Sequence, residues 1–257
     1  MVRVCWPDGE GQAKARPEAR AANLRHNSFM DDAQLRKIQD ALNTNGYKKY
    51  CVWGRDSLDA TESTIREYCA CLDSARDEKP IQEFLTNEPW MLVAEEGGHC
   101  RWVIPQKSLA GKFFPDFIVG RLDSTGLKWK LVELQSPRAQ LFTKKGRPAD
   151  QLREGIEQVQ RWRLWLRNNR DMACRSPAQD GLGLMSIDYN TNGLVIIGRA
   201  SDRNEYNREH LEQLSWENRI WIHSYDWLAL EAYSRIAARR DFGKGQCEEC
   251  QDADHQN

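Results

Sequence analysis

Phe114-Pro115-Asp116-Phe117-Ile118-Val119 and Leu131-Val132-Glu133-Leu134-Gln135 are two apolar segments, and each is interrupted by a carboxylate. Their β-branched and aromatic residues indicate buried strands over Phe113–Arg121 and Lys128–Gln135. Asp123-Ser124-Thr125-Gly126 lies between them and suits a tight turn, with Asp at its first position and Gly at its fourth. The stretch therefore predicts an antiparallel pair of strands at the centre of the fold.

The turn sets which residues of this pair face each other. If Asp123 pairs with Gly126, then Asp116 lies opposite Glu133, and facing side chains point to the same side roughly 5 Å apart. Gln135 shares that side because side chains alternate along a strand. A bulge would shift the register by one residue. The arithmetic favours a cluster of Asp116, Glu133 and Gln135.

Two carboxylates side by side on an apolar sheet require compensation. Mutual repulsion and desolvation disfavour the ionised form of both. A hard divalent cation such as Mg²⁺ accepts carboxylate and carbonyl oxygens, orients a phosphodiester and lowers the pKa of an attacking water. The alternative is that Asp116 only follows a turn-like Pro115 while Glu133 faces solvent, which would leave no site.

The pattern around these strands predicts an α/β fold with a mixed central sheet flanked by helices. Helical spacing of apolar residues indicates helices over Asp32–Asn45, Ser57–Asp73, Glu78–Asn87, Asp150–Asn168, Arg203–Glu217 and Tyr225–Arg239. Further strands are expected over Trp90–Glu96, Cys100–Pro105, Leu194–Ile197 and Ile220–His223. Gly97-Gly98 would join the first two of these as a hairpin.

Composition excludes several classes of protein. No apolar run approaches the roughly 18 to 20 residues of a membrane span, and residues 1–10 lack the apolar core of a secretion signal. We therefore expect a cytoplasmic protein with no membrane partner. Without export, the eight cysteines are expected as thiols. Cys69 with Cys71 and Cys247 with Cys250 leave a structural zinc open, although such sites normally need four ligands.

The charge distribution is uneven along the chain. The net charge is only −1, yet Arg101–Arg170 contains fifteen Lys and Arg against six Asp and Glu. A basic segment of this kind is typical of proteins that bind a phosphate backbone. An ordinary solvated helix face would explain the same composition.

The spacing of Asp116 and Glu133 resembles the PD-(D/E)XK nuclease motif, and longer stretches are similar to the Shedu C-terminal nuclease domain. The resemblance covers roughly residues 78 to 235. The stretches that carry it are Glu78–Pro89, the strand with Asp116, Glu133–Gly146, Leu152–Trp165, Val195–Arg199 and Ile222–Leu228.

The resemblance implies a restriction-endonuclease-like core and a phage-defence nuclease that hydrolyses DNA with Mg²⁺ or Mn²⁺. Asp116 and Glu133 would hold the metal, and the carbonyl of Leu134 would complete its coordination. Gln158 would lie beside the site, and Glu78 would reach the metal directly or through water. As alternatives, Gln158 fills polar space between helix and sheet, and Glu78 only begins its helix near the positive end of the dipole.

Composition, apolar periodicity and the extent of the resemblance together divide the chain into four parts. Residues 1–30 are expected to form a mobile arm, 31–75 an N-terminal helical extension, 76–240 the nuclease-like domain, and 241–257 a flexible tail. The expected partners are DNA and further copies of the chain in a homo-oligomer. The helical extension is a natural place for self-association.

One departure from the motif concerns its third residue, which is usually Lys and is Gln135 here. A glutamine can orient water by hydrogen bonding, but it supplies no positive charge. Lys144 and Lys145, in a flexible loop with Gly146, are candidates for the missing cation. Two interpretations stay open: an active endonuclease, and a catalytically inactive nuclease-like module that binds or senses nucleic acid.

Arginines recur along the helix that follows the motif, and they are Arg153, Arg161, Arg163, Arg167 and Arg170. Arginine pairs with phosphate through two hydrogen bonds, so this helix could follow a DNA backbone, with Arg153 and Arg161 as the first candidates beside Lys144 and Lys145. Trp165 and Trp221 are expected to be packing residues.

Overall fold

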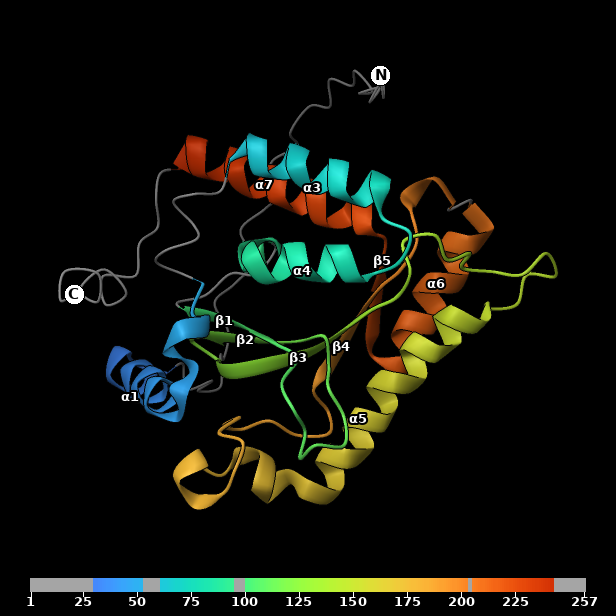
Figure 1. Cartoon of the computed structure of the whole chain (residues 1–257). Coiled ribbons are helices and arrows are strands. Elements are labelled where there is room, and N and C mark those ends of the chain that lie inside the picture. The colour runs from blue at the N-terminus through green and yellow to red at the C-terminus, as the bar shows by residue number, and fades with distance from the viewer. Residues whose placement is uncertain (1–29, 53–60, 95–99, 203–204, 243–257) are drawn as a thin grey trace, which may run out of the picture.

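A five-stranded sheet lies between two layers of helices in the computed structural model, which describes residues 30–52, 61–94, 100–202 and 205–242 (Figure 1). The strands follow the order β1-β2-β3-β4-β5 across the sheet. Their bounds are β1 Cys100–Pro105, β2 Phe117–Asp123, β3 Gly126–Leu134, β4 Asn192–Ile196 and β5 Ile220–His223. The first three pair antiparallel and the last two join in parallel. The predicted α/β class and mixed sheet are confirmed.

The β2–β3 hairpin has the register that the turn predicts. Asp123 pairs with Gly126, and the ladder continues without a bulge to Phe117 opposite Val132. Gly126 has φ 106°, a left-handed conformation that glycine adopts without a steric penalty. Asp116 and Glu133 are therefore the next facing residues beyond the last pair of the ladder, Phe117 with Val132.

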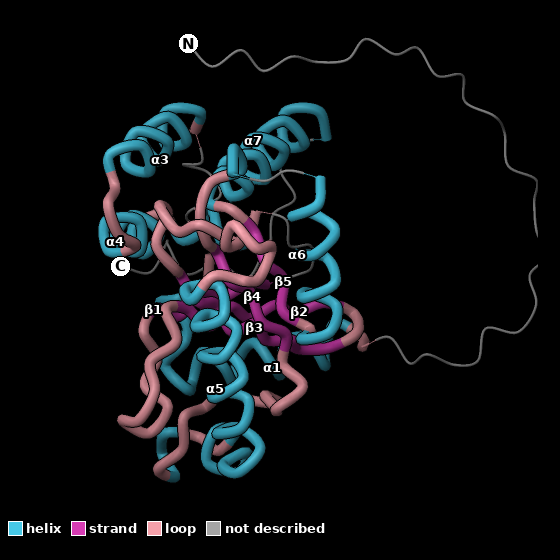
Figure 2. The backbone as a smooth tube through the Cα atoms, turned by 90° about the vertical axis from the view of Figure 1, so that its right-hand side faces the viewer, coloured by secondary structure: helices cyan, strands magenta, loops and turns pink. Residues whose placement is uncertain are grey.

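Three helices cover one face of the sheet, and they are α3 Glu62–Ser74, α4 Lys79–Asn87 and α7 Tyr225–Phe242. Helices α3 and α7 lie side by side in both views (Figures 1 and 2). Ile65, Tyr68 and Leu72 form the buried stripe of α3 and pack in one apolar cluster with Leu194 and Ile196 of β4. The part of the predicted second helix before residue 61 lies outside the described residues.

The opposite face carries α1 Asp32–Leu42, α5 Asp150–Cys174 and α6 Glu205–Asn218. Helix α1 begins at a capping box in which Asp31 and Gln34 exchange hydrogen bonds with each other's backbone. Helix α5 extends beyond its predicted end and buries the expected apolar positions, which are Leu152, Ile156, Val159 and Leu166. Helices on both faces bury the sheet, which explains why its central strands are apolar throughout.

The strand predicted over Trp90–Glu96 is wrong. Residues Pro89–Val93 form a 3-10 helix, and Trp90 and the three residues after it are all buried. Pro89 at the first helical position fixes a helical φ, and a fully buried run has no alternation that separates a strand from a helix. Gly97 and Gly98, predicted to turn a hairpin, lie outside the described residues.

The helices assigned to an N-terminal extension belong to the apolar clusters that include the sheet, where α3 lies against α4 and α7. Leu35 and Leu42 of α1 belong to the apolar cluster beneath the sheet, and α3 belongs to the cluster above it. The predicted mobile arm (1–30) and flexible tail (241–257) fall almost wholly outside the described residues. None of the described helices is both long enough and apolar enough to cross a membrane.

Candidate functional site

The two motif carboxylates meet where β2 begins and β3 ends. Asp116 Oδ2 accepts a hydrogen bond from the backbone N–H of Leu134 at 2.7 Å. Glu133 is buried, with 5% of its surface exposed, and its carboxyl group shares a hydrogen bond with that of Asp116. The hairpin register thus brings the two acids into contact.

Helix α4 supplies two more polar groups to this pair. Gln82 Nε2 donates a hydrogen bond to Asp116 Oδ1 at 2.5 Å. Glu78 occupies the N-cap position of α4, and its charge raises the pKa of both Asp116 and Glu133, which places it near them. Gln82 has no role in the sequence prediction, although its position four residues after Glu78 puts both on one helix face.

Burial controls the protonation of the pair. The pKa of Asp116 is raised mainly by desolvation, and the hydrogen bonds from Leu134 and Gln82 offset only part of this. The pKa of Glu133 is raised further, first by desolvation and then by the charge of Asp116. No ion pair in the described part of the chain involves either acid. Glu133 is buried and Asp116 is half-buried, and among the described residues neither has a cation to compensate for its charge. Full ionisation of both is therefore disfavoured, and the pair retains a proton at a pH above the ordinary carboxyl range.

Gln135 lies two residues after Glu133 and forms three hydrogen bonds, one through its side chain and two through its backbone. Its Nε2 donates to Glu133 Oε1 at 2.9 Å. Its backbone N–H donates to Ile196 O at 2.9 Å, and its carbonyl accepts from the Tyr225 hydroxyl at 2.7 Å. Burial raises the pKa of Tyr225, and the charges of Asp116, Glu78 and Glu133 add to this. Tyr225 comes from α7, far along the chain, and no local sequence signal indicates it.

Helix α5 closes over this side of the sheet at Gly155. A β-carbon at that position would lie 2.9 Å from Val195 Cγ1 and 3.1 Å from Gln135 Cγ, so a side chain would displace the Gln135 side chain or the core. Gln158 is half-buried one turn further along the same helix. It is therefore on the face of α5 that approaches the sheet.

The oxygen donors at this site suit a hard cation such as Mg²⁺. No group of three or more His, Cys, Asp or Glu within the described ranges is arranged to hold a metal ion. The available set is the two carboxylates of Asp116 and Glu133, the carbonyl of Leu134, and Glu78 nearby. Mg²⁺ binds through one or two carboxylates and keeps several waters, so a set of this size fits it.

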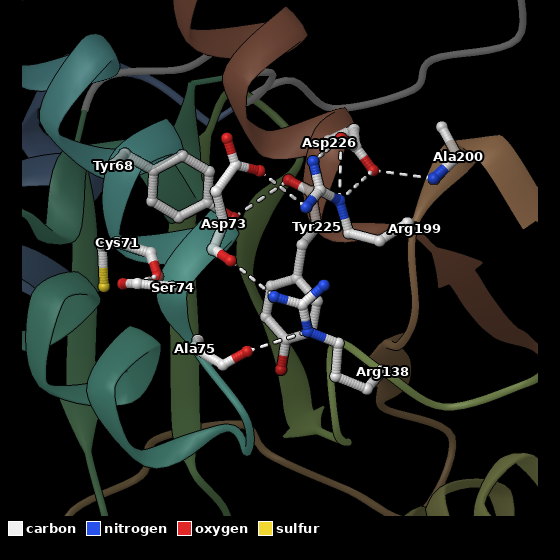
Figure 3. A network of polar contacts seen from close by, with 10 residues as sticks. All are labelled: Tyr68, Cys71, Asp73, Ser74, Ala75, Arg138, Arg199, Ala200, Tyr225 and Asp226. Carbon is white, nitrogen blue, oxygen red and sulfur yellow. Dashed lines mark hydrogen bonds and ion pairs between the residues drawn. The ribbon is translucent and has the colours of Figure 1, made fainter.

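A second polar network joins the end of α3 to the two loops that follow β3 and β4 (Figure 3). Arg138 donates to the carbonyls of Ala75 at 2.9 Å and Asp73 at 2.5 Å. Arg199 donates to the Asp73 carboxylate at 2.8 Å and to Asp226 at 3.0 Å. These contacts hold residues 73–75, the segment that leads directly into Glu78 and α4.

The predicted DNA-contacting cations are exposed and lie apart from the carboxylate pair in the chain. Lys144 and Lys145 occupy a turn in which Gly146 N donates to Thr143 O at 2.9 Å, so the turn is hydrogen-bonded rather than an open loop. Arg153 pairs with Asp150 and Arg161 with Glu157 along the surface of α5. Exposed pairs of this kind contribute about 0–1 kcal/mol, which allows a phosphate to replace the carboxylate.

Two side chains differ from their predicted roles. Arg163 does not face a DNA backbone, because it donates to the carbonyls of Thr191, Asn218 and Arg219 at 2.7 to 2.8 Å. Trp165 is buried, as predicted, but Trp221 is 41% exposed and is not a core residue. Trp221 lies on β5, at the edge of the sheet, where the described part of the chain supplies a neighbouring strand on one side only.

Within the described residues, the cysteines of α3 belong to no group of three or more side chains that could hold a metal ion. Cys69 and Cys71 are free thiols, and burial raises the pKa of both, which disfavours the thiolate that binds zinc. Cys247 and Cys250 lie outside the described residues.

Comparison with protein families gives a match over more than half of the chain. The model of the family described as Shedu protein SduA, C-terminal, matches residues 75–229. This range begins at the end of α3 and extends into α7, so it includes every candidate site residue named above. Among curated proteins, none matches the chain.

Proposed function

Because this chain belongs to the Shedu protein SduA C-terminal family, we propose that it is a metal-dependent endonuclease that hydrolyses DNA phosphodiester bonds. Membership of the family indicates a defence-related, nuclease-like module. The proposal adds the reaction, the substrate and the cofactor, Mg²⁺ or Mn²⁺. It also assigns the sheet and its helices to the PD-(D/E)XK, restriction-endonuclease-like class.

The observation that carries the proposal is the carboxylate pair, in which Glu133 is buried and Asp116 is half-buried. Asp116 and Glu133 share a hydrogen bond and have raised pKa values, and no cation of the described chain forms an ion pair with them. Such an arrangement costs stability unless a ligand compensates for it. Strongly perturbed carboxyls beside further polar groups are typical of functional sites.

In this proposal each group has a separate task. Asp116, Glu133 and the Leu134 carbonyl hold the cation, which when bound supplies a water of lowered pKa and neutralises charge on the phosphate. Gln82 fixes the orientation of the Asp116 carboxylate through its hydrogen bond. Glu78 accepts a proton or orients a water at the open side of the pair. Gln158 is placed to contact the substrate or to fill polar space beside Gln135.

DNA is the proposed partner because the segment around the site is basic and exposed. Lys144 and Lys145 lie on a turn between β3 and α5, and Arg153 and Arg161 lie on the outer face of α5. Contacts of this kind bind phosphates without regard to base sequence, so affinity should fall steeply with salt. A homo-oligomer is part of the proposal and would extend this basic surface.

The direct test is incubation of supercoiled plasmid with the purified chain in Mg²⁺, Mn²⁺ or EDTA. Nicking with either metal, its loss in EDTA, and its loss in Asp116→Asn and Glu133→Gln would support the proposal. Circular dichroism of each variant controls for folding. Nicking that persists in EDTA or in both variants would contradict it.

One observation favours a second candidate, a catalytically inactive module that binds nucleic acid. Gln135 supplies no positive charge at the third motif position, and one N–H of its amide is already bonded to Glu133. On this reading, plasmid or oligonucleotide binds in a salt-dependent manner, but neither metal supports nicking.

A further inference from the structure

A hollow of about 820 Å³ opens between α6 and the exposed edge strand β5. Its lining includes Arg208, Trp216, Arg219, Trp221 and His223. This volume is within the range of about 300–1,000 Å³ found for small-ligand sites in proteins. None of these residues takes part in the carboxylate site.

Two indoles in this hollow are exposed to an unusual degree. Trp216 is 85% exposed and Trp221 is 41% exposed. The Lys130 ammonium lies 4.3 Å from the centre of the Trp221 ring, a cation–π contact that holds the ring in place. Large aromatic side chains that are exposed to solvent and close together indicate a binding surface, because residues that serve only for packing are buried.

The turn from α6 to β5, which lies between the two tryptophans in the sequence, is strained and is held by hydrogen bonds. Arg219 lies between them in the sequence and has φ 53°, a left-handed conformation that is uncommon for a residue with a side chain. Arg163 holds this turn by donating to the carbonyls of Asn218 and Arg219 at 2.7 Å. Backbone strain that the surrounding structure maintains tends to occur at functional sites.

Positive charge accompanies the aromatic rings. Arg208 and Arg219 are exposed. Within the described ranges, neither arginine forms an ion pair. Among the described residues that line the hollow, Glu212 is the single acid. Burial lowers the pKa of Arg163, and the nearby guanidinium of Arg219 adds to this. Adjacent guanidinium groups without matching acids favour an anion such as a phosphate.

We propose that this hollow binds a single-stranded segment of nucleic acid, with bases stacked on Trp216 and Trp221 and phosphates at Arg208 and Arg219. Every base has a π-face, and exposed aromatic rings beside cations are the usual means of holding unpaired bases without reading their sequence. In a duplex the bases are paired and stacked on one another, so they cannot stack on the indoles of Trp216 and Trp221. This inference goes beyond the proposed cleavage, because the hollow uses different residues and requires no metal.

The test measures the affinity of the full chain for a fluorescein-labelled oligothymidylate by anisotropy, in EDTA so that no cleavage can occur. Trp216→Ala and Trp221→Ala should each weaken binding about tenfold, equivalent to about 1.4 kcal/mol, and Arg208→Ala should weaken it about fivefold. Tyr233→Ala serves as the matched control, because Tyr233 is also an aromatic residue with 41% exposure but lies on α7 outside the hollow. It should leave the affinity unchanged.

Trp216→Phe should recover most of the lost affinity, because it restores a stacking ring. Since Trp216 is almost fully exposed, its variants test the proposal even if Trp221→Ala fails to fold. Equal affinity of wild type and Trp216→Ala would overturn the proposal, as would equal competition by a blunt duplex or by thymidine monophosphate. A change of oligomeric state in Trp216→Ala, with unchanged oligonucleotide affinity, would instead assign the surface to a second copy. Absence of plasmid nicking would count against the cleavage proposal alone.

Discussion

The side-chain amide of Gln135 donates a hydrogen bond to Glu133 Oε1 at 2.9 Å, and both residues are buried. The residue at the third motif position therefore stabilises the carboxylate at the second. This relationship explains how the strand tolerates a polar pair in the interior, since a buried polar group is costly only when it lacks a partner.

Replacing Gln135 by lysine should increase cleavage. An ammonium beside Glu133 would favour the ionised carboxylate and stabilise negative charge on the reacting phosphate. We expect Gln135→Lys to nick plasmid at least about tenfold faster in Mg²⁺ than the wild type, which corresponds to a barrier lower by about 1.4 kcal/mol. Gln135→Met, similar in length but uncharged, is the control and should be slower than the wild type. A Lys variant no faster than the wild type would show that positive charge is not what limits the site.

The free energy of unfolding in EDTA should decrease as pH rises. A carboxyl whose pKa is raised by folding stabilises the folded state fully below its unfolded pKa, about 4, and this contribution is lost as pH rises through the higher folded pKa. Burial raises the pKa of both Asp116 and Glu133. Urea unfolding from about pH 5 to about pH 8 measures the slope.

Glu133→Gln should flatten this slope, because an amide does not titrate. Added Mg²⁺ should raise the wild-type stability at the higher pH and should have little effect on the variant, since a ligand that binds only the folded state stabilises it. Identical slopes for the two chains would show that the pair does not titrate in this range.

The close approach of α5 to the sheet can be tested at Gly155. Alanine there would meet Val195 at 2.9 Å and Gln135 at 3.1 Å. Overpacking costs about 1–3 kcal/mol, and the higher helix propensity of alanine offsets up to about 1 kcal/mol of it. We expect Gly155→Ala to lower stability by about 1 kcal/mol and to reduce nicking more than DNA affinity. Glu154→Ala, one residue earlier on the exposed side of α5, should leave stability, nicking and DNA affinity unchanged.

Loss of the Asp226 carboxylate should weaken the attachment of the loop after β4 to α7. Asp226 accepts from Arg199 and from the backbone N–H of Ala200 at 2.7 Å, and these bonds hold the pKa of the Asp226 carboxyl below its usual range. Asp226→Ala should lower the free energy of unfolding by about 2 kcal/mol, the usual loss for a hydrogen bond to a charged group. Asp73→Ala removes a largely exposed partner of the same arginine and should cost about 0.5 kcal/mol or less. Equal losses in the two variants would contradict this assignment.

The central hairpin could be derived from the sequence because its turn is short and specific. A four-residue turn with Asp first and Gly last leaves one register, and the structure has that register from Asp123 to Phe117. The apolar stripes of the helices were readable for the same reason, since periodicity over many residues is a strong signal. The run after Pro89 was misread as a strand because every residue in it is buried, which removes the periodicity.

The surroundings of the carboxylate pair were less predictable. Gln82 contacts Asp116 from a helix in the other layer, and Tyr225 reaches Gln135 from ninety residues away. Such contacts depend on how helices dock on the sheet, which no local pattern encodes. Trp221 was assigned to the core because most tryptophans pack there. Its exposure follows from its place on the edge strand, a position set by the order of strands across the sheet.

The most direct test of the central claim is calorimetric titration of the chain with Mn²⁺ in the absence of DNA. The claim is that Asp116 and Glu133 together hold a divalent cation. We predict saturable binding by the wild type that weakens as pH falls, because protons compete for the raised-pKa carboxyls. We also predict that Asp116→Asn/Glu133→Gln, with an unchanged circular dichroism spectrum, loses this binding. The same affinity and stoichiometry in the double variant as in the wild type would contradict the account.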